Sequence, residues 1–263
     1  MKIQPLSEEA CLVKISSLIK IWIKKFSKKT LIIAFWLITW EAVSFFIGNH
    51  ILLVGPLAVF ARLAEIIQTS NFWESTWVSL SRILIGFSLA FIIGIILASL
   101  CASVKLVKEF MLPVLNVIKS IPVASFVVLA IFWVGSNNLS MFISFITVLP
   151  IVYFNCYKAI KETDEKLLEM AKVFRVPLYK KVRYIYFRET LPHLISAANT
   201  GFGFAWKSGI AAELIGITQG TIGFNLHTAR VFLQTDYVFA WTFSIVIFSY
   251  IVEKAFLLLL RRF

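Results

Sequence analysis

The chain has 263 residues, of which 59% are hydrophobic and only 15% are charged. A soluble domain must present a wetted surface, and it cannot hide so large an apolar fraction. The composition therefore argues against a soluble helical domain and indicates an integral membrane protein. The net charge of +12 would suggest nucleic acid in a soluble protein, but the basic residues here lie between apolar runs, so no nucleic-acid partner is expected.

Apolar runs predict where the chain crosses the membrane. A bilayer core of about 30 Å needs roughly 20 residues in a helix, and lipid leaves no partner for unpaired backbone groups. Four runs are long enough: Leu31–Gly48, Trp77–Cys101, Leu139–Tyr157 and Val238–Leu260. A fifth run, Leu194–Ile217, is apolar apart from Lys207, Glu213 and small polar residues.

The region between the second and third of these runs predicts one broken helix. Val123–Val134 alone would reach only about 18 Å, too short to cross. Adding Phe110–Pro122 gives enough length, although that stretch contains Pro113 and ends at Pro122. Such irregular backbone is tolerated where it lies inside protein or lines a cavity. The sequence therefore predicts an all-α protein with six transmembrane helices, one of them broken by proline.

The basic residues predict the orientation of these spans. With the N-terminus in the cytoplasm, inside segments hold 21 Lys and Arg residues and outside loops hold two, Arg62 and Arg230. By the positive-inside rule, both termini are cytoplasmic. The chain then divides into a basic N-terminal segment, 1–30, and a transmembrane domain, 31–263. Leu12–Lys29 is expected to be an amphipathic helix on the membrane surface, the alternative being a disordered basic tail.

Small residues recur at every fourth position in two predicted spans. The rows are Gly86, Ala90, Gly94, Ala98 and Ala102 in one span, and Ala197, Gly201, Ala205 and Gly209 in the other. Small side chains let helix backbones approach closely in lipid. We therefore expect these two spans to be central in the bundle.

Ionisable residues inside spans are costly and are candidates for the translocation pathway or its gates. These candidates are Arg82, Lys119, Lys207 and Glu213, with Pro122 at the predicted break. Arg82 and Glu213 both fall near the outer end of their spans, which suggests an ion pair; the alternative is that each reaches the interface independently. Lys207 suits either an anionic substrate or a structural partner.

The longest inside loop, 158–190, contains an amphipathic pattern. Leu167, Leu168, Ala171 and Phe174 follow a helical period, with Thr163 or Asp164 as the N-cap, and Pro177 interrupts the pattern. A short helix, a break and a second helix suit docking to a soluble partner. A solvated basic loop would have no reason to carry an apolar face.

This loop resembles the EAA segment of ABC importer permeases. Glu169-Met170-Ala171 stands at its Glu-Ala-Ala, with Met170 in place of the first alanine, Arg175 at its glycine and Ile185 at its isoleucine. Further segments resemble the nitrate/sulfonate/taurine branch in the same order: SLSRILIGF (79–87), IKSIP (118–122), IFWVGSNN (131–138), LPHLISAANTGFGFAWKSGIAAELIG (191–216) and GTIGFNLHTARVFLQTDYVFAW (220–241). The core of the resemblance covers about residues 72–260.

The resemblance implies a type I ABC importer architecture in a bacterial inner membrane. Two permease copies, expected to be identical, would form the pore with two cytoplasmic ATPase subunits and an extracytoplasmic binding protein. The coupling helix would lie at Glu169–Pro177 and include Met170, Ala171, Phe174 and Arg175. The solute would be a small anion such as a sulfonate, taurine or nitrate, or alternatively a thiamine-precursor pyrimidine or riboflavin. Arg175 and Arg188 depart from the family's glycine and first proline.

No catalytic or metal site is predicted, and the chain is expected to bind no cofactor itself. Residues 201–208, GFGFAWKS, approach a phosphate loop, but Trp206 stands in place of its second glycine. ATP with magnesium would be used by the partner subunits. Two functions of another class stay open: a secondary transporter that works alone, and a membrane scaffold for soluble proteins.

Overall fold

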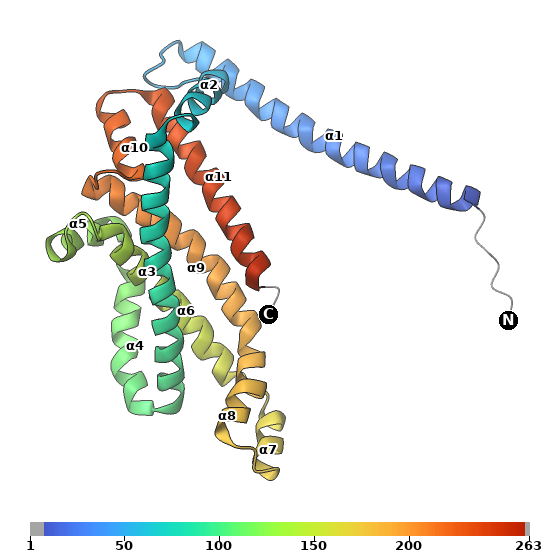
Figure 1. The fold of residues 1–263 in the computed structure, drawn as a ribbon, viewed down its shortest axis with the longest axis vertical. Helices are drawn as coiled ribbons and strands as arrows, with labels where there is room; N and C mark the ends of the chain where they lie inside the picture. Colours follow the sequence, from blue (N-terminus) through green and yellow to red (C-terminus); the bar gives the residue numbers. More distant parts are fainter. Residues whose placement is uncertain (1–7, 261–263) are drawn as a thin grey trace. The chain divides into compact units, whose positions relative to one another are not determined.

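The computed structural model describes residues 8–260, and every regular element within this range is helical (Figure 1). Its contacts divide the chain into two units, Met1–Ala61 and Arg62–Phe263. The predicted all-α class is confirmed for the described residues.

The first unit contains α1, an uninterrupted helix from Glu8 to Ile47. Neither proline nor glycine occurs between these residues, so nothing in the sequence stops the helix before Gly48. Its Lys28–Ile47 part is long and apolar enough to cross a membrane. No break separates the predicted surface segment from the predicted span, and the surface placement of Leu12–Lys29 stays a prediction. A short helix, α2 (Pro56–Ile67), follows with proline at its first position.

Three long helices form the centre of the second unit: α3 (Ser70–Ser103), α6 (Leu139–Lys161) and α9 (Phe187–Gly216). α6 packs along both α3 and α9. Four of the five small residues predicted in α3 and all four in α9 are buried. At Gly86 the approach is so close that an added Cβ would clash with the carbonyl oxygen of Met141 in α6. The two predicted rows therefore pack as expected, with α6 as a major partner of both.

The predicted broken helix consists of two separate helices. α4 (Lys105–Ser120) and α5 (Val123–Val134) meet at an angle of 111°. Ile121 between them is extended, with φ −74° and ψ 129°, as expected before a proline, and Pro122 then precedes α5. The first helix begins at Lys105 rather than at Phe110. This geometry fits either of two arrangements: one membrane span broken in the middle, or a re-entrant loop whose two helices do not cross the membrane.

The count of apolar spans is lower than the predicted six. Four helices are long and apolar enough to cross a membrane, and the bent α4–α5 pair makes a fifth if it is one span. The last of the four is the Thr235–Ala255 part of α11 (Thr235–Leu260). α9 is 30 residues long but falls outside this count. Its polar residues, among them Lys207 and Glu213, lower its mean hydropathy.

The remaining helices lie at the two ends of the second unit. α7 (Glu165–Val173), α8 (Leu178–Lys181) and a π-helical turn (Val182–Tyr186) join α6 to α9, and α10 (Ile222–Val231) joins α9 to α11. Figure 1 shows α7 and α8 at the end of this unit opposite α10. The predicted docking loop and the α9–α10 corner therefore belong to opposite ends of the bundle.

Candidate translocation pathway and coupling loop

A cavity of about 460 Å³ lies beside the break between α4 and α5. Residues of α4, α5, α6 and α9 line it together with Ile121 from the break: Ile118, Lys119, Ile121, Val123, Phe126, Ile143, Ile146, Thr147, Pro150, Ile151, Phe154, Asn155, Thr200 and Phe204. This volume lies in the range of small-molecule sites. Of the predicted pathway residues, only Lys119 lines the cavity; Pro122 lies between two lining residues.

Lys119 is the charged residue of this lining. Its Nζ lies 5.2 Å from the ring centroid of Phe154, a cation–π distance. Asn155 donates from Nδ2 to the carbonyl of Ile151 at 2.8 Å, and Thr147 donates to that of Ile143 at 2.7 Å. The cavity thus combines one ammonium group with mostly apolar walls.

Lys207 and Arg82 lie outside this cavity. Lys207 is exposed on α9 and is absent from the cavity lining. Arg82 is half-buried on α3, and its Nη1 is buried without a hydrogen-bond partner. The three cations predicted inside spans therefore do not converge on one site.

Glu213 is fully buried and joins three helices. Its Oε2 accepts hydrogen bonds from the Ser79 hydroxyl of α3 at 2.7 Å and from the Gly223 amide of α10 at 3.4 Å. The Ser79 oxygen also accepts from the Ile222 amide at 3.0 Å. A carboxylate at the first turn of a helix satisfies amides that have no partner within that helix. The start of α10 is thereby fixed to α3 and α9.

Gly223 makes this attachment possible. An added Cβ at this residue would clash with Glu213 and with the backbone of Leu214. The first turn of α10 therefore lies directly against α9. Thr221, buried just before it, caps α10 by accepting from the Phe224 amide at 3.2 Å.

The predicted ion pair between Arg82 and Glu213 is not formed at hydrogen-bonding distance. Ser79, three residues before Arg82 in α3, binds the carboxylate instead. Glu213 Oε1 has no hydrogen-bond partner in the structure, and neither has Arg82 Nη1. The sequence analysis missed Ser79 and Gly223. The available signal was a serine inside an apolar run, which is too common in membrane helices to single out one residue.

The predicted coupling loop forms two short helices at the opposite end. Asp164 is the N-cap of α7, where its carboxylate accepts from the Lys166 amide at 2.9 Å, so one of the two predicted caps is confirmed. Ala171 is 3% exposed, whereas Phe174 is 74% exposed. Other large apolar side chains exposed around it are Met170, Val173, Leu178 and Tyr179. Glu169 and Arg175 line a concavity beside α7.

α7 ends in a Schellman motif centred on Arg175. The Val176 amide donates to the carbonyl of Ala171 at 2.9 Å, and the Arg175 amide donates to that of Lys172 at 3.1 Å. Arg175 has φ 49°, in the left-handed region that this motif requires and that favours glycine. The turn therefore keeps the geometry of a glycine cap although it lacks glycine. Pro177 follows as the N-cap of α8.

Arg175→Gly is expected to raise the free energy of unfolding by about 0.5–1 kcal/mol, because it removes the cost of a Cβ in the left-handed region. Thermal unfolding of the purified chain in detergent measures this change. Arg175→Ala removes the guanidinium but keeps the Cβ, and it is expected to give no such gain. A glycine variant no more stable than the alanine variant would contradict this account of the turn.

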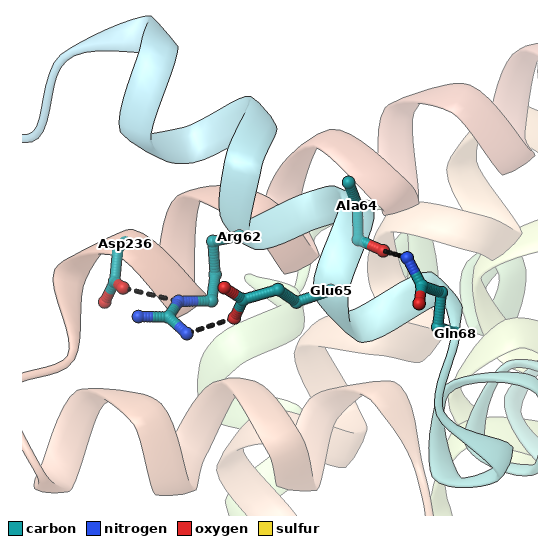
Figure 2. Close-up of polar contacts among 5 residues, drawn as sticks. All are labelled: Arg62, Ala64, Glu65, Gln68 and Asp236. Carbon is teal, nitrogen blue, oxygen red and sulfur yellow. Dashed lines mark hydrogen bonds and ion pairs between the residues drawn. The ribbon is translucent and has the colours of Figure 1, made fainter.

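Near α10, an ion-pair cluster joins α2 to α11. Arg62 donates from Nε to Asp236 Oδ2 at 2.7 Å and also pairs with Glu65, as Figure 2 shows. Its guanidinium carbon lies 4.5 Å from the ring centroid of Tyr237. The hydrogen bond to Asp236 raises the pKa of Arg62 above its usual value, so the guanidinium stays charged across the physiological range.

Arg62→Ala and Asp236→Ala are expected to show a coupling energy of about 0.5–1 kcal/mol in a double-mutant cycle. The side chains are 31% and 26% exposed, so solvent screens the pair only in part. Chemical unfolding in detergent measures the four free energies. The coupling is expected to shrink in high salt, and strict additivity at low salt would show that the pair contributes nothing.

Long apolar helices, a cavity beside the α4–α5 break and an exposed amphipathic loop are typical of a polytopic membrane protein of the transport type. The family described as "Binding-protein-dependent transport system inner membrane component" matches residues 90–263. Because this match covers more than half of the sequence, the chain belongs to that family of inner-membrane permeases.

Known relatives place the chain in the sulfonate, taurine and nitrate branch of ABC importer permeases. It is 26% identical to the putative aliphatic sulfonates transport permease SsuC of Bacillus subtilis, over 92% of this chain and 86% of that protein. It is 23% identical to the taurine transport permease TauC of Escherichia coli, over 85% and 83% of the two chains. The crystal structure of an amino acid ABC transporter with histidines shares the fold, with a TM-score of 0.58 at 16% identity, over 76% of this chain and 98% of that one.

Proposed function

We propose that this chain is the translocation subunit of an ATP-driven importer for a small anion, coupled to cytoplasmic ATPase subunits through α7. The observation that carries the coupling role is the apolar surface around Phe174 on a capped, well-defined turn. Large apolar side chains exposed on a loop outside the membrane mark an interaction surface. Met170 and Phe174 lie at the end of α7, where a groove of an ATPase subunit can receive them.

The proposed topology has six spans with both termini in the cytoplasm. α9 is the span that apolar composition alone does not identify, and its length of 30 residues is sufficient for crossing. Its polar residues suit a helix that faces protein or a pathway rather than lipid. The excess of basic residues in the α6–α9 loop supports a cytoplasmic position for α7.

The translocation role rests on the cavity beside the α4–α5 break. Irregular backbone at membrane depth is tolerated where it lines a cavity, and binding sites of transporters form at such breaks. Lys119 is the proposed pathway cation in this cavity. Arg82, Lys207 and Glu213 are proposed to act outside it, Glu213 by holding α10 in place near the outer end.

The proposed assembly contains two copies of this chain, two ATPase subunits that bind ATP with magnesium, and an extracytoplasmic binding protein. The sequence of this chain offers no phosphate loop, so ATP hydrolysis is assigned to the partners. The relatives named for sulfonate and taurine transport support a small anionic solute.

Co-purification and uptake together test this proposal. The chain is co-expressed with a candidate ATPase subunit and a candidate binding protein from the same organism, purified and reconstituted into liposomes. The proposal predicts a stable complex with the ATPase and uptake that requires ATP. Uptake without ATP or ATPase would instead show a secondary transporter, and a complex that moves no solute would show a scaffold.

A further inference from the structure

Arg175 occupies a position in the turn after α7 where glycine would be more stable. Its φ of 49° lies in the left-handed region, where a Cβ raises the energy of the backbone. Glycine at this position would close the same Schellman motif without that cost. Within residues 8–260, the guanidinium makes no ion pair that could offset the cost. Backbone strain of this kind points to a role for the Arg175 side chain outside the turn.

Arg175 shares a concavity beside α7 with two other cations. The concavity has a volume of about 440 Å³, and its charged lining residues are Glu169, Lys172, Arg175 and Lys181. None of these four side chains takes part in an ion pair within the described part of the chain. The Lys181 Nζ instead lies 5.7 Å from the ring centroid of Tyr186. Three cations against one carboxylate leave this lining with an excess of positive charge.

The concavity adjoins the apolar surface around Phe174. Arg175 directly follows Phe174 in the chain, and Lys172 precedes it by two residues. Both cations are exposed, as is Phe174 itself. Protein interfaces commonly have an apolar centre surrounded by a rim of polar and charged groups. The cations therefore lie where the rim of a contact centred on Phe174 would form.

The mixed charge of the lining favours a protein surface over an anionic lipid surface. Lipid phosphates would attract the cations but repel the Glu169 carboxylate beside them. A protein can place acidic side chains opposite the cations and leave Glu169 facing a donor or water. Arginine suits such a contact, because its planar guanidinium can donate two parallel hydrogen bonds to one carboxylate.

We propose that Arg175, together with Lys172 and Lys181, binds acidic side chains on the rim of the ATPase groove that receives Phe174, and that this contact selects the ATPase subunit with which the permease assembles. The inference rests on the proposed coupling role of α7 and adds to it the charge that the partner surface carries. Glycine at position 175 would stabilise the turn but remove the contact. Stability and partner binding are therefore expected to change in opposite directions in Arg175→Gly.

Titration of the permease with its ATPase tests the proposal. The ATPase subunit that co-purifies with the chain is labelled and added to the permease in nanodiscs, with and without anionic phosphatidylglycerol, in low and in high salt. Arg175→Glu, Arg175→Gln and Arg175→Lys all keep a Cβ, so their thermal unfolding midpoints should equal that of the parent chain. Lys105→Glu is the matched control, because it reverses a charge that is 89% exposed and does not line the concavity.

In low salt, Arg175→Glu is expected to raise the dissociation constant at least about tenfold and Arg175→Gln roughly three- to tenfold, because a like-charge contact costs more than a lost ion pair. Arg175→Lys should lose less than Arg175→Gln, and Lys105→Glu should bind as the parent does. High salt should weaken binding of the parent more than binding of Arg175→Gln. Reversal of one acidic residue of the ATPase groove to lysine should restore binding of Arg175→Glu.

Three outcomes would overturn the proposal while leaving α7 as the docking element. Arg175→Glu could bind the ATPase as tightly as the parent while Phe174→Asp binds weakly, which would exclude the cations from the contact. Equal weakening by Lys105→Glu would show a general effect of net charge. A loss confined to nanodiscs that contain phosphatidylglycerol would assign the cations to the membrane surface. Failure of the proposed function is distinguishable, because no ATPase subunit would then co-purify with the parent chain.

Discussion

Replacing Glu213 by alanine is expected to lower the free energy of unfolding by roughly 2–4 kcal/mol. The substitution leaves the Ser79 hydroxyl and the Gly223 amide buried without their acceptor, and each unsatisfied buried group costs about 1–3 kcal/mol. The start of α10 would no longer be fixed to α3 and α9, so uptake is expected to fall as well. Chemical unfolding of the purified chain in detergent measures the first effect, and ATP-dependent uptake measures the second.

Two further variants separate this network from a general effect of removing a carboxylate. Glu74→Ala removes an exposed glutamate of α3 and is expected to change stability by less than about 0.5 kcal/mol. Ser79→Ala removes one hydroxyl from the network and should give a smaller loss than Glu213→Ala. If Glu213→Ala were as stable as Glu74→Ala, the carboxylate would not hold the α9–α10 corner together.

Phe174→Asp is expected to weaken association with the ATPase roughly 10- to 100-fold and to abolish coupling between solute and ATP hydrolysis. Burial of a phenylalanine side chain contributes about 1.5–3 kcal/mol, and the aspartate would bring an unpaired charge into the contact. The side chain is 74% exposed in the isolated chain, so its loss should leave the permease itself folded. Titration of the reconstituted permease with ATPase subunit, followed by ATP hydrolysis, measures both effects.

Phe174→Leu is the matched control for this substitution, because it keeps most of the apolar surface. We expect Phe174→Leu to retain at least half of the solute-stimulated hydrolysis. The thermal unfolding midpoint of both variants should equal that of the parent chain. If Phe174→Asp kept normal coupling between solute and ATP hydrolysis, the ATPase contact would not lie at α7.

Patterns within a single helix could be predicted from the sequence. The small-residue rows of α3 and α9 are buried almost as expected, since a row at every fourth position defines a helix face regardless of its partner. The N-cap at Asp164 was predictable for the same reason, because a cap depends on neighbours along the chain. Pro122 likewise restricted Ile121 locally, and α4 ends beside it.

Relations between helices were not predictable in the same way. The sequence predicted that Arg82 and Glu213 lie at a similar depth in the membrane. Depth alone does not determine which faces of the two helices pack against each other. One helical turn in α3 decides whether arginine or serine reaches the carboxylate, and Ser79 reaches it. The conformation at Arg175 could not be predicted either, because arginine favours the left-handed region less than glycine does. The surrounding Schellman hydrogen bonds hold Arg175 in that conformation despite its side chain.

The most direct test of the account is a cross-link from α7 to the ATPase. A photoreactive amino acid replaces Phe174 in the chain assembled with its ATPase and binding protein, with the same substitution at Phe132 as the control on an exposed face of α5. The account predicts that the probe at 174 forms a covalent product with the ATPase subunit, in a yield that changes with ATP, whereas the probe at 132 forms none. Absence of an ATPase product at 174 in a complex that still hydrolyses ATP would contradict the assignment of α7 as the coupling helix.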